Sequence, residues 1–140
     1  MNEAEMIQYI IDTFDDVQTS ADSGNTFFFF GQERKFPFAT LVANDAYEHV
    51  SNLDRPGVFR LNIGVSKQTY RSLFPESDDE RGYDFTALDQ IMPHPVYGRM
   101  YWVCVLNPGA ATFETVQRLL AEAYERDVSK HAKARPVNQP

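Results

Sequence analysis

The sequence contains a single cysteine, Cys104, and has no long hydrophobic run. One cysteine cannot form a disulfide within the chain, which excludes the disulfide-stabilised class of small secreted domains and is typical of a reducing compartment. The apolar runs are far shorter than the roughly 20 residues that a membrane-spanning helix needs. A helix carrying Glu3, Glu5 and Asp12 is expected within a few residues of Met1, which leaves no room for a signal peptide. We therefore expect a cytoplasmic protein with no membrane partner.

Histidines are also few, and acidic side chains outnumber basic ones. The three histidines lie far apart and show no metal-ligand spacing: His49, His94 and His131. The sequence has neither a Gly-x-Ser-x-Gly nucleophile elbow nor a phosphate-binding P-loop. The 20 acidic and 13 basic residues give a formal net charge of −7, which repels phosphate backbones at long range. We therefore expect no metal, no cofactor and no catalytic residue, and this charge disfavours nucleic acid as a partner.

Aromatic side chains, in contrast, are abundant. The 140 residues include 11 phenylalanines and 7 tyrosines, enough rings to fill the core of a chain of this length. We expect one domain over residues 1–135 and a flexible C-terminal tail over residues 136–140. Cys104 lies in an apolar run, so we expect it to be a small buried side chain rather than a reactive thiol.

Residues 57–65 are the clearest strand in the sequence. Their apolar members alternate with Arg60, Asn62 and Gly64, as a strand with one buried face requires, because successive side chains point to opposite faces of a sheet. The apolar side chains are Phe59, Leu61, Ile63 and Val65. We expect these four in the core, and we expect Arg60 and Asn62 on an exposed face of the sheet.

The remaining elements follow from periodicity and from capping signals. Helices are expected over 2–14 with an Asn2–Glu5 capping box, over 67–74 after an N-cap at Ser66, and from an N-cap at Thr112 to about Arg135. Further strands are expected over 26–30, 36–43 and 101–106. Residues 18–25 are interpreted as a loop, 44–49 and 84–89 as short helical turns, and the acidic run 76–80 as a solvated loop.

This element order predicts the fold class. Short hairpin connections make the first three strands antiparallel, and helices with one apolar stripe each can pack together on one side of such a sheet. We expect an α+β two-layer sandwich, with an antiparallel sheet, helices on one face and the order α-β-β-β-α-β(β)-α.

The last third of the chain carries a recognisable pattern. The segment His94-Pro-Val-Tyr97 precedes a strand beginning Tyr101-Trp102, and the final helix carries Tyr124 near its end. Together with the strand Phe59-Arg-Leu-Asn62, this pattern resembles the YjbR/MmcQ-like family with its double-wing fold. It is similar also to a group of bacterial proteins of unknown function with the strings Arg-Pro-Gly-Val-Phe-Arg-Leu-Asn and Met-Pro-His-Pro-Val-Tyr. The resemblance implies a single YjbR-like domain and, by analogy of fold, nucleic-acid binding.

The candidate site combines polar and aromatic side chains from the two conspicuous strands. If these strands are neighbours, a guanidinium, an amide and an imidazole converge among aromatic rings, which suits a small anionic or planar ligand. The candidate ligand-binding residues are Arg60, Asn62, His94, Tyr97, Tyr101 and Trp102. The alternative is a structural network, in which Arg60 pairs with a carboxylate such as Asp84 and His94 bonds to the backbone.

Three function classes remain open from the sequence. The first is a binding module for a small molecule or protein, acting as a monomer or weak homodimer through the polar sheet face. The second is a nucleic-acid-binding protein, which requires a basic stripe assembled from Arg34, Lys35, Arg99 and Lys130. The third is a small enzyme, for instance one that uses a Cys104–His94 nucleophile pair at the surface.

Overall fold

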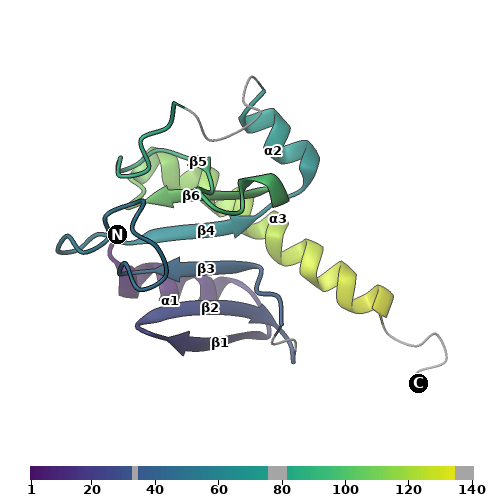
Figure 1. The fold of residues 1–140 in the computed structure, drawn as a ribbon. Helices are drawn as coiled ribbons and strands as arrows, with labels where there is room; N and C mark the ends of the chain where they lie inside the picture. Colours follow the sequence, from purple (N-terminus) through teal and green to yellow (C-terminus); the bar gives the residue numbers. More distant parts are fainter. Residues whose placement is uncertain (33–34, 76–81, 135–140) are drawn as a thin grey trace.

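The structure is organised around one antiparallel sheet (Figure 1). This computed structural model describes residues 1–32, 35–75 and 82–134. Within these residues six strands lie in the order β1-β2-β3-β4-β6-β5, accompanied by three α-helices and one 3-10 helix. In chain order the elements are α1 (Glu3–Thr13), β1 (Val17–Asp22), β2 (Asn25–Phe30), β3 (Ala39–Val42), β4 (Arg60–Gly64), α2 (Lys67–Leu73), β5 (Met92–Pro93), η1 (Gly98–Met100), β6 (Trp102–Leu106) and α3 (Ala110–Ala134).

The helices pack on one face of the sheet, which confirms the predicted α+β arrangement. Figure 1 shows α1 and α3 behind the strands, on the same side of the sheet. The apolar side chains that α1 and α3 bury form one cluster with those of β4, and Tyr70 of α2 and Phe74 join it. Members of this helix-side core include Met6, Ile10, Leu61, Ile63, Val116 and Leu120.

The predicted alternation in residues 57–65 is confirmed on this face. Phe59, Leu61, Ile63 and Val65 are at most 1% exposed and belong to the helix-side core. The starts of the first two helices are confirmed as well. Asn2 and Glu5 form a reciprocal capping box, and Ser66 Oγ accepts the Thr69 N–H at 3.0 Å at the start of α2.

The opposite face of the sheet is also covered, which the sequence analysis did not foresee. Loop residues 44–58 and 83–91 pack over β3, β4 and β6, and their apolar side chains form a second cluster. It contains Val42, Leu53, Met92, Cys104 and Leu106, with Val58, Tyr83 and Phe85 against it. The expectation of an exposed face around Arg60 and Asn62 is therefore wrong, because each residue is 2% exposed.

Residues 18–25 were expected to form a loop, and this expectation is also wrong. They comprise five residues of β1, the hairpin turn Ser23-Gly24 and the first residue of β2, and all six residues of β1 pair with β2. Ser23 and Gly24, with φ of 55° and 81°, supply the two positive φ angles that a type I′ hairpin requires. Four of the six residues of β1 are exposed, so this edge strand carries no alternation of apolar side chains that could identify it.

Three further predictions of secondary structure need correction. The strand expected over 36–43 is only β3, because Pro37 lacks the N–H that a ladder requires. Residues 44–49 are an irregular loop rather than a helical turn, since the Asn44 and Asp45 side chains accept backbone N–H groups of this loop. The helix α3 begins at Ala110, before the N-cap expected at Thr112. A residue 20 positions earlier in the sequence holds this helix start, because Asp89 Oδ1 accepts the Gly109 N–H at 2.6 Å.

Some predictions fall beyond what the structure covers. The acidic run 76–80 and the tail 136–140 lie outside the described residues.

The helical turn expected over residues 84–89 is not formed. These residues contain a single turn, in which the Ala87 N–H donates to the Asp84 carbonyl at 3.0 Å. In the described part of the chain, no helix combines the length and the apolar character needed to cross a membrane.

The buried position of Ile63 yields a stability prediction. Ile63→Ala should lower the free energy of unfolding by about 2–5 kcal/mol, because the truncated side chain leaves a cavity in the helix-side core. Leu88 is 50% exposed, so Leu88→Ala should change stability by about 0.5 kcal/mol or less. Urea unfolding of both variants measures the difference. Equal effects of the two substitutions would contradict the burial assigned to β4.

Candidate functional site

The structure places the predicted site residues on and beside β4 and β6, but Tyr101 packs against Tyr70 of α2 at the helix-side core. The strands β4 and β6 are neighbours, as the site prediction required, and their register pairs Asn62 with Cys104 and Gly64 with Trp102. The predicted residues nevertheless separate into two groups. Arg60, Asn62 and His94 are buried, whereas Tyr97 is 53% exposed and Tyr101 and Trp102 are partly buried.

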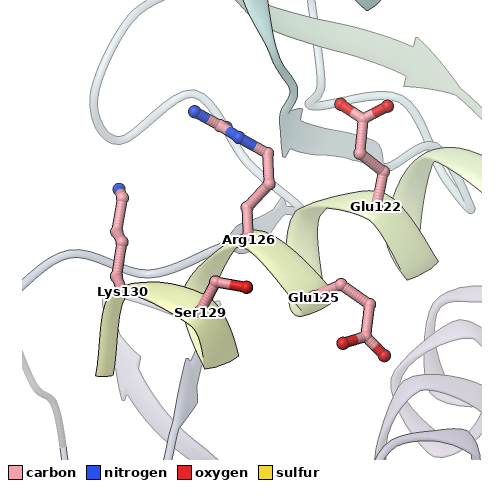
Figure 2. Close-up of a pocket in the computed structure, with 5 residues that line it drawn as sticks. All are labelled: Glu122, Glu125, Arg126, Ser129 and Lys130. Carbon is pink, nitrogen blue, oxygen red and sulfur yellow. The ribbon is translucent and has the colours of Figure 1, made fainter. Parts of the chain in front are cut away.

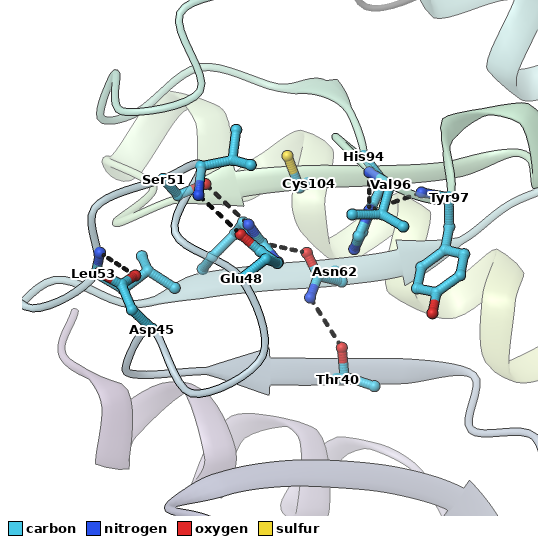
Figure 3. Close-up of polar contacts among 12 residues, drawn as sticks. Thr40, Asp45, Glu48, Ser51, Leu53, Asn62, His94, Val96, Tyr97 and Cys104 are labelled. Atoms are coloured by element: carbon cyan, nitrogen blue, oxygen red, sulfur yellow. Dashed lines mark hydrogen bonds and ion pairs between the residues drawn. The ribbon is translucent and has the colours of Figure 1, made fainter.

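The Arg60 guanidinium is the centre of a buried polar network. Its Nε donates to Asn62 Oδ1 at 3.0 Å, and its Nη1 donates to Ser51 Oγ at 2.8 Å. Its Nη2 forms an ion pair with Glu48. Asn62 Nδ2 in turn donates to Thr40 Oγ1 at 2.9 Å. The network therefore joins β3 and β4 to the loop that carries Glu48 and Ser51 (Figure 3).

This arrangement is the structural network that the sequence analysis held open as the alternative. The carboxylate is Glu48, however, and not Asp84, whose side chain binds the Thr86 hydroxyl and N–H instead. Each nitrogen of the Arg60 fork has an acceptor, and Ser51 is fully buried. Three of the five N–H donors of the guanidinium are thus bonded, one on each nitrogen, and the residue is 2% exposed, so the network fixes the loop rather than offering an open pocket.

His94 holds the backbone that follows β5. Its Nδ1 accepts the N–H groups of Val96 and Tyr97, each at 3.0 Å, so the neutral ring carries its proton on Nε2. Burial, and secondarily the positive charge of Arg60, lowers the pKa of His94 to about 3. His94 therefore acts at neutral pH as an uncharged acceptor that shapes residues 94–97, as the alternative interpretation proposed.

Cys104 is buried in the second apolar cluster, between the sheet and the loops that cover it. This position confirms the prediction that Cys104 is a small core side chain. Burial raises the pKa of the Cys104 thiol to about 12, and its Sγ lies 3.6 Å from the Pro93 carbonyl oxygen. A thiol in this state is not a nucleophile at neutral pH. The surface Cys104–His94 pair that an enzyme would need is therefore not formed.

The residues from Val96 to Trp102, here called the 96–102 segment, carry the exposed part of the site. Val96, Tyr97 and Met100 are 50%, 53% and 66% exposed. In Figure 3 the labelled Val96 and Tyr97 extend from the backbone near His94, in front of β4. Three of the nine exposed large hydrophobic side chains in the described residues thus fall within five consecutive positions.

Backbone hydrogen bonds fix this segment. The Gly98 N–H donates to the His94 carbonyl and the Tyr101 N–H donates to the Gly98 carbonyl, each at 3.0 Å. Tyr101 adopts a left-handed conformation with φ of 66°, and its carbonyl accepts the Val65 N–H at 3.0 Å. Trp102 lies over Gly64, where an added Cβ would approach Trp102 Cε2 to 3.1 Å, so a glycine at this position of β4 makes room for the indole.

A separate groove lies on the outer side of α3 (Figure 2). It has a volume of about 380 Å³ and is lined by Glu122, Glu125, Arg126, Ser129 and Lys130. Glu122 is already engaged, since its carboxylate accepts the Ser66 N–H at 2.7 Å and the Thr69 hydroxyl at 2.5 Å. Sequence reasoning named only Lys130 here, because a groove along one helix leaves no signature beyond ordinary surface charges.

The cations named for a basic stripe lie on separate parts of the chain, as that hypothesis assumed. Arg99 lies in η1 and Lys130 lines the groove on α3, while Arg34 lies outside the described residues. A metal site is likewise unsupported. No group of three or more potential metal-ligating side chains occurs among the residues that the structure describes.

The ion pair between Arg60 and Glu48 yields a prediction. Glu48→Ala should lower the free energy of unfolding by about 3–5 kcal/mol, because it leaves the buried guanidinium without a counter-charge. Glu125, which is exposed on α3, provides the matched control, and Glu125→Ala should cost about 0.5 kcal/mol or less. Chemical unfolding at neutral pH measures both. A cost for Glu48→Ala as small as that of the control would show that the network does not hold the loop.

His94 yields a pH prediction. A pKa lowered from 6.5 to about 3 means that the fold favours the neutral ring, so this stabilisation is present above pH 6.5 and is lost as the pH falls below that value. Lowering the pH from 7 to 5 should cost about 2 kcal/mol through His94 alone. His94→Asn keeps an acceptor but does not titrate. Between pH 7 and pH 5 the unfolding free energy of this variant should therefore fall less than that of the wild type, by the amount that His94 contributes. His49→Asn, at an exposed histidine, is the control and should retain the full pH dependence.

Comparisons with known proteins support the fold and identify the family. No curated protein matches the sequence. A crystal structure of a protein from Pseudomonas syringae, a structural genomics target, is similar with a TM-score of 0.59 and 16% sequence identity, over 91% of this chain and 99% of that one. At this identity the likeness concerns the fold alone. A family model described as a family of unknown function (DUF6194) matches residues 1–136. The chain therefore belongs to the DUF6194 family, whose function is unknown.

Proposed function

We propose that this chain is a cytoplasmic binding module that holds a protein partner against the 96–102 segment. One observation carries the proposal: Val96, Tyr97 and Met100 are exposed by half or more on a backbone fixed by hydrogen bonds at both ends. Apolar side chains gathered on a surface commonly mark interaction sites. A segment that is already ordered loses little conformational entropy when it binds.

The predicted site residues then have two different roles. Tyr97 and the partly buried Trp102 belong to the surface that would contact the partner, whereas Tyr101 packs against Tyr70 of α2 and supports the segment from the helix side. Arg60, Asn62 and His94 act below it, the first two by holding the neighbouring loop to the sheet and His94 by accepting two N–H groups of the segment. We propose that the second group shapes the site without touching the partner.

The alternatives have less support. A nucleic-acid partner would have to approach a chain of net charge −7, which repels phosphate backbones at long range. An enzyme would need an accessible nucleophile or base, whereas Cys104 and His94 are both buried. The predicted resemblance to the YjbR/MmcQ-like family, with its implied DNA binding, stays a prediction.

The test is capture of a partner from a lysate of the source organism on the immobilised protein. The proteins retained by the wild type should be lost when Tyr97→Ala and Met100→Ala are combined, because both exposed contacts are removed. Leu88→Ala removes an equally exposed side chain elsewhere and should retain them. A partner captured equally by the double variant would place the binding surface elsewhere. Capture of no protein by the wild type, with a thermal shift from a metabolite, would replace the protein partner by a small molecule.

A further inference from the structure

The 96–102 segment carries one isolated positive charge. Arg99 is the only Asp, Glu, Lys or Arg between Ile91 and Leu106, and it is exposed. His94 adds no charge at neutral pH, because burial lowers its pKa to about 3. Within the described residues no carboxylate forms an ion pair with Arg99. The surface is thus apolar, with a single guanidinium next to the exposed Met100.

We propose that this segment binds an acidic peptide with large apolar side chains, presented by another protein. This inference rests on the proposed function and names the chemistry of the partner. A guanidinium binds a carboxylate through two parallel hydrogen bonds, while Val96, Tyr97 and Met100, which flank Arg99 in the sequence, are exposed and can contact apolar side chains. An apolar partner without acidic residues would leave Arg99 beside the interface without a counter-charge.

A second copy of this chain fits the segment less well. In a two-fold symmetric contact the same surface meets itself, which would bring the two copies of Arg99 close together. The segment contains no Asp or Glu to neutralise them. A partner of different sequence, with carboxylates of its own, avoids this repulsion.

The net charge of the chain also limits the partner. At −7 the protein repels anions at long range, and this repulsion grows with the number of charges that a partner carries. Nucleic acid and anionic membranes present dense arrays of negative charge, whereas a short peptide brings only a few carboxylates. Contact with Arg99 can therefore offset the repulsion for a peptide more easily than for a polyanion.

Selection from a displayed library of random peptides tests this inference. The wild type should enrich peptides that combine Asp or Glu with Leu, Phe or Trp. Synthetic copies of enriched peptides that contain no tryptophan are then titrated with the fluorescence of Trp102, the only tryptophan of the chain, as the signal. Arg99→Glu should weaken their binding by about tenfold or more. Arg118→Glu, an exposed charge reversal on α3, should leave it within about twofold.

The outcomes separate the inference from the proposed function. One outcome is that the enriched peptides lack acidic residues, bind the combined Tyr97→Ala and Met100→Ala variant weakly and bind Arg99→Glu normally. The segment is then a binding site, but the inference of an acidic partner fails. If the double variant enriches and binds the same peptides as the wild type, both the site and the inference fail. Enrichment of acidic peptides that depends on both Arg99 and the apolar side chains establishes the proposed chemistry.

Discussion

The buried charge of Arg60 constrains the whole loop-covered face of the sheet. A guanidinium that is 2% exposed costs several kcal/mol unless a counter-charge and acceptors reach it. Asn62 supplies one acceptor from the same strand, but Glu48 and Ser51 come from the loop. The loop must therefore lie on the sheet, and this position also buries Leu53 against β3 and β6. One cation thus determines where some fifteen residues without regular secondary structure are placed.

This constraint moves the available surface to the rim of the sheet. Helices cover one face, and loops cover the other face over β3, β4 and β6, so the central strands present no broad binding surface. The 96–102 segment leads into the start of β6, and its framework includes the buried His94, which accepts two of its N–H groups. The residues that hold this segment in place, such as His94, are buried, whereas the side chains that can contact a partner, such as Tyr97, are exposed. This difference in role explains why the six predicted site residues differ so much in exposure.

The sequence was informative where a pattern has only one structural meaning. The alternation around Leu61 and Ile63 and the Asn2–Glu5 capping box were predicted correctly, whereas the pairing of the two conspicuous strands was only a condition of the site prediction. A polar residue at every second position has two meanings, however, because Arg60 and Asn62 alternate in the same way whether they meet water or a buried network. Only the fold shows that Glu48 reaches Arg60. The edge strand β1 was missed since its exposed polar side chains have no apolar period.

Hydrogen exchange of the wild type and of Glu48→Ala, followed by mass spectrometry, tests the role of Arg60 most directly. If the buried ion pair holds the loop, amides of residues 44–57 should lose more protection in the variant than amides of α1 and α3, because the loop opens locally before the core unfolds. The Leu53 N–H, which donates to Asp45 at 2.9 Å, lies within this region. Equal loss of protection in the loop and in the helices would contradict this role of the ion pair.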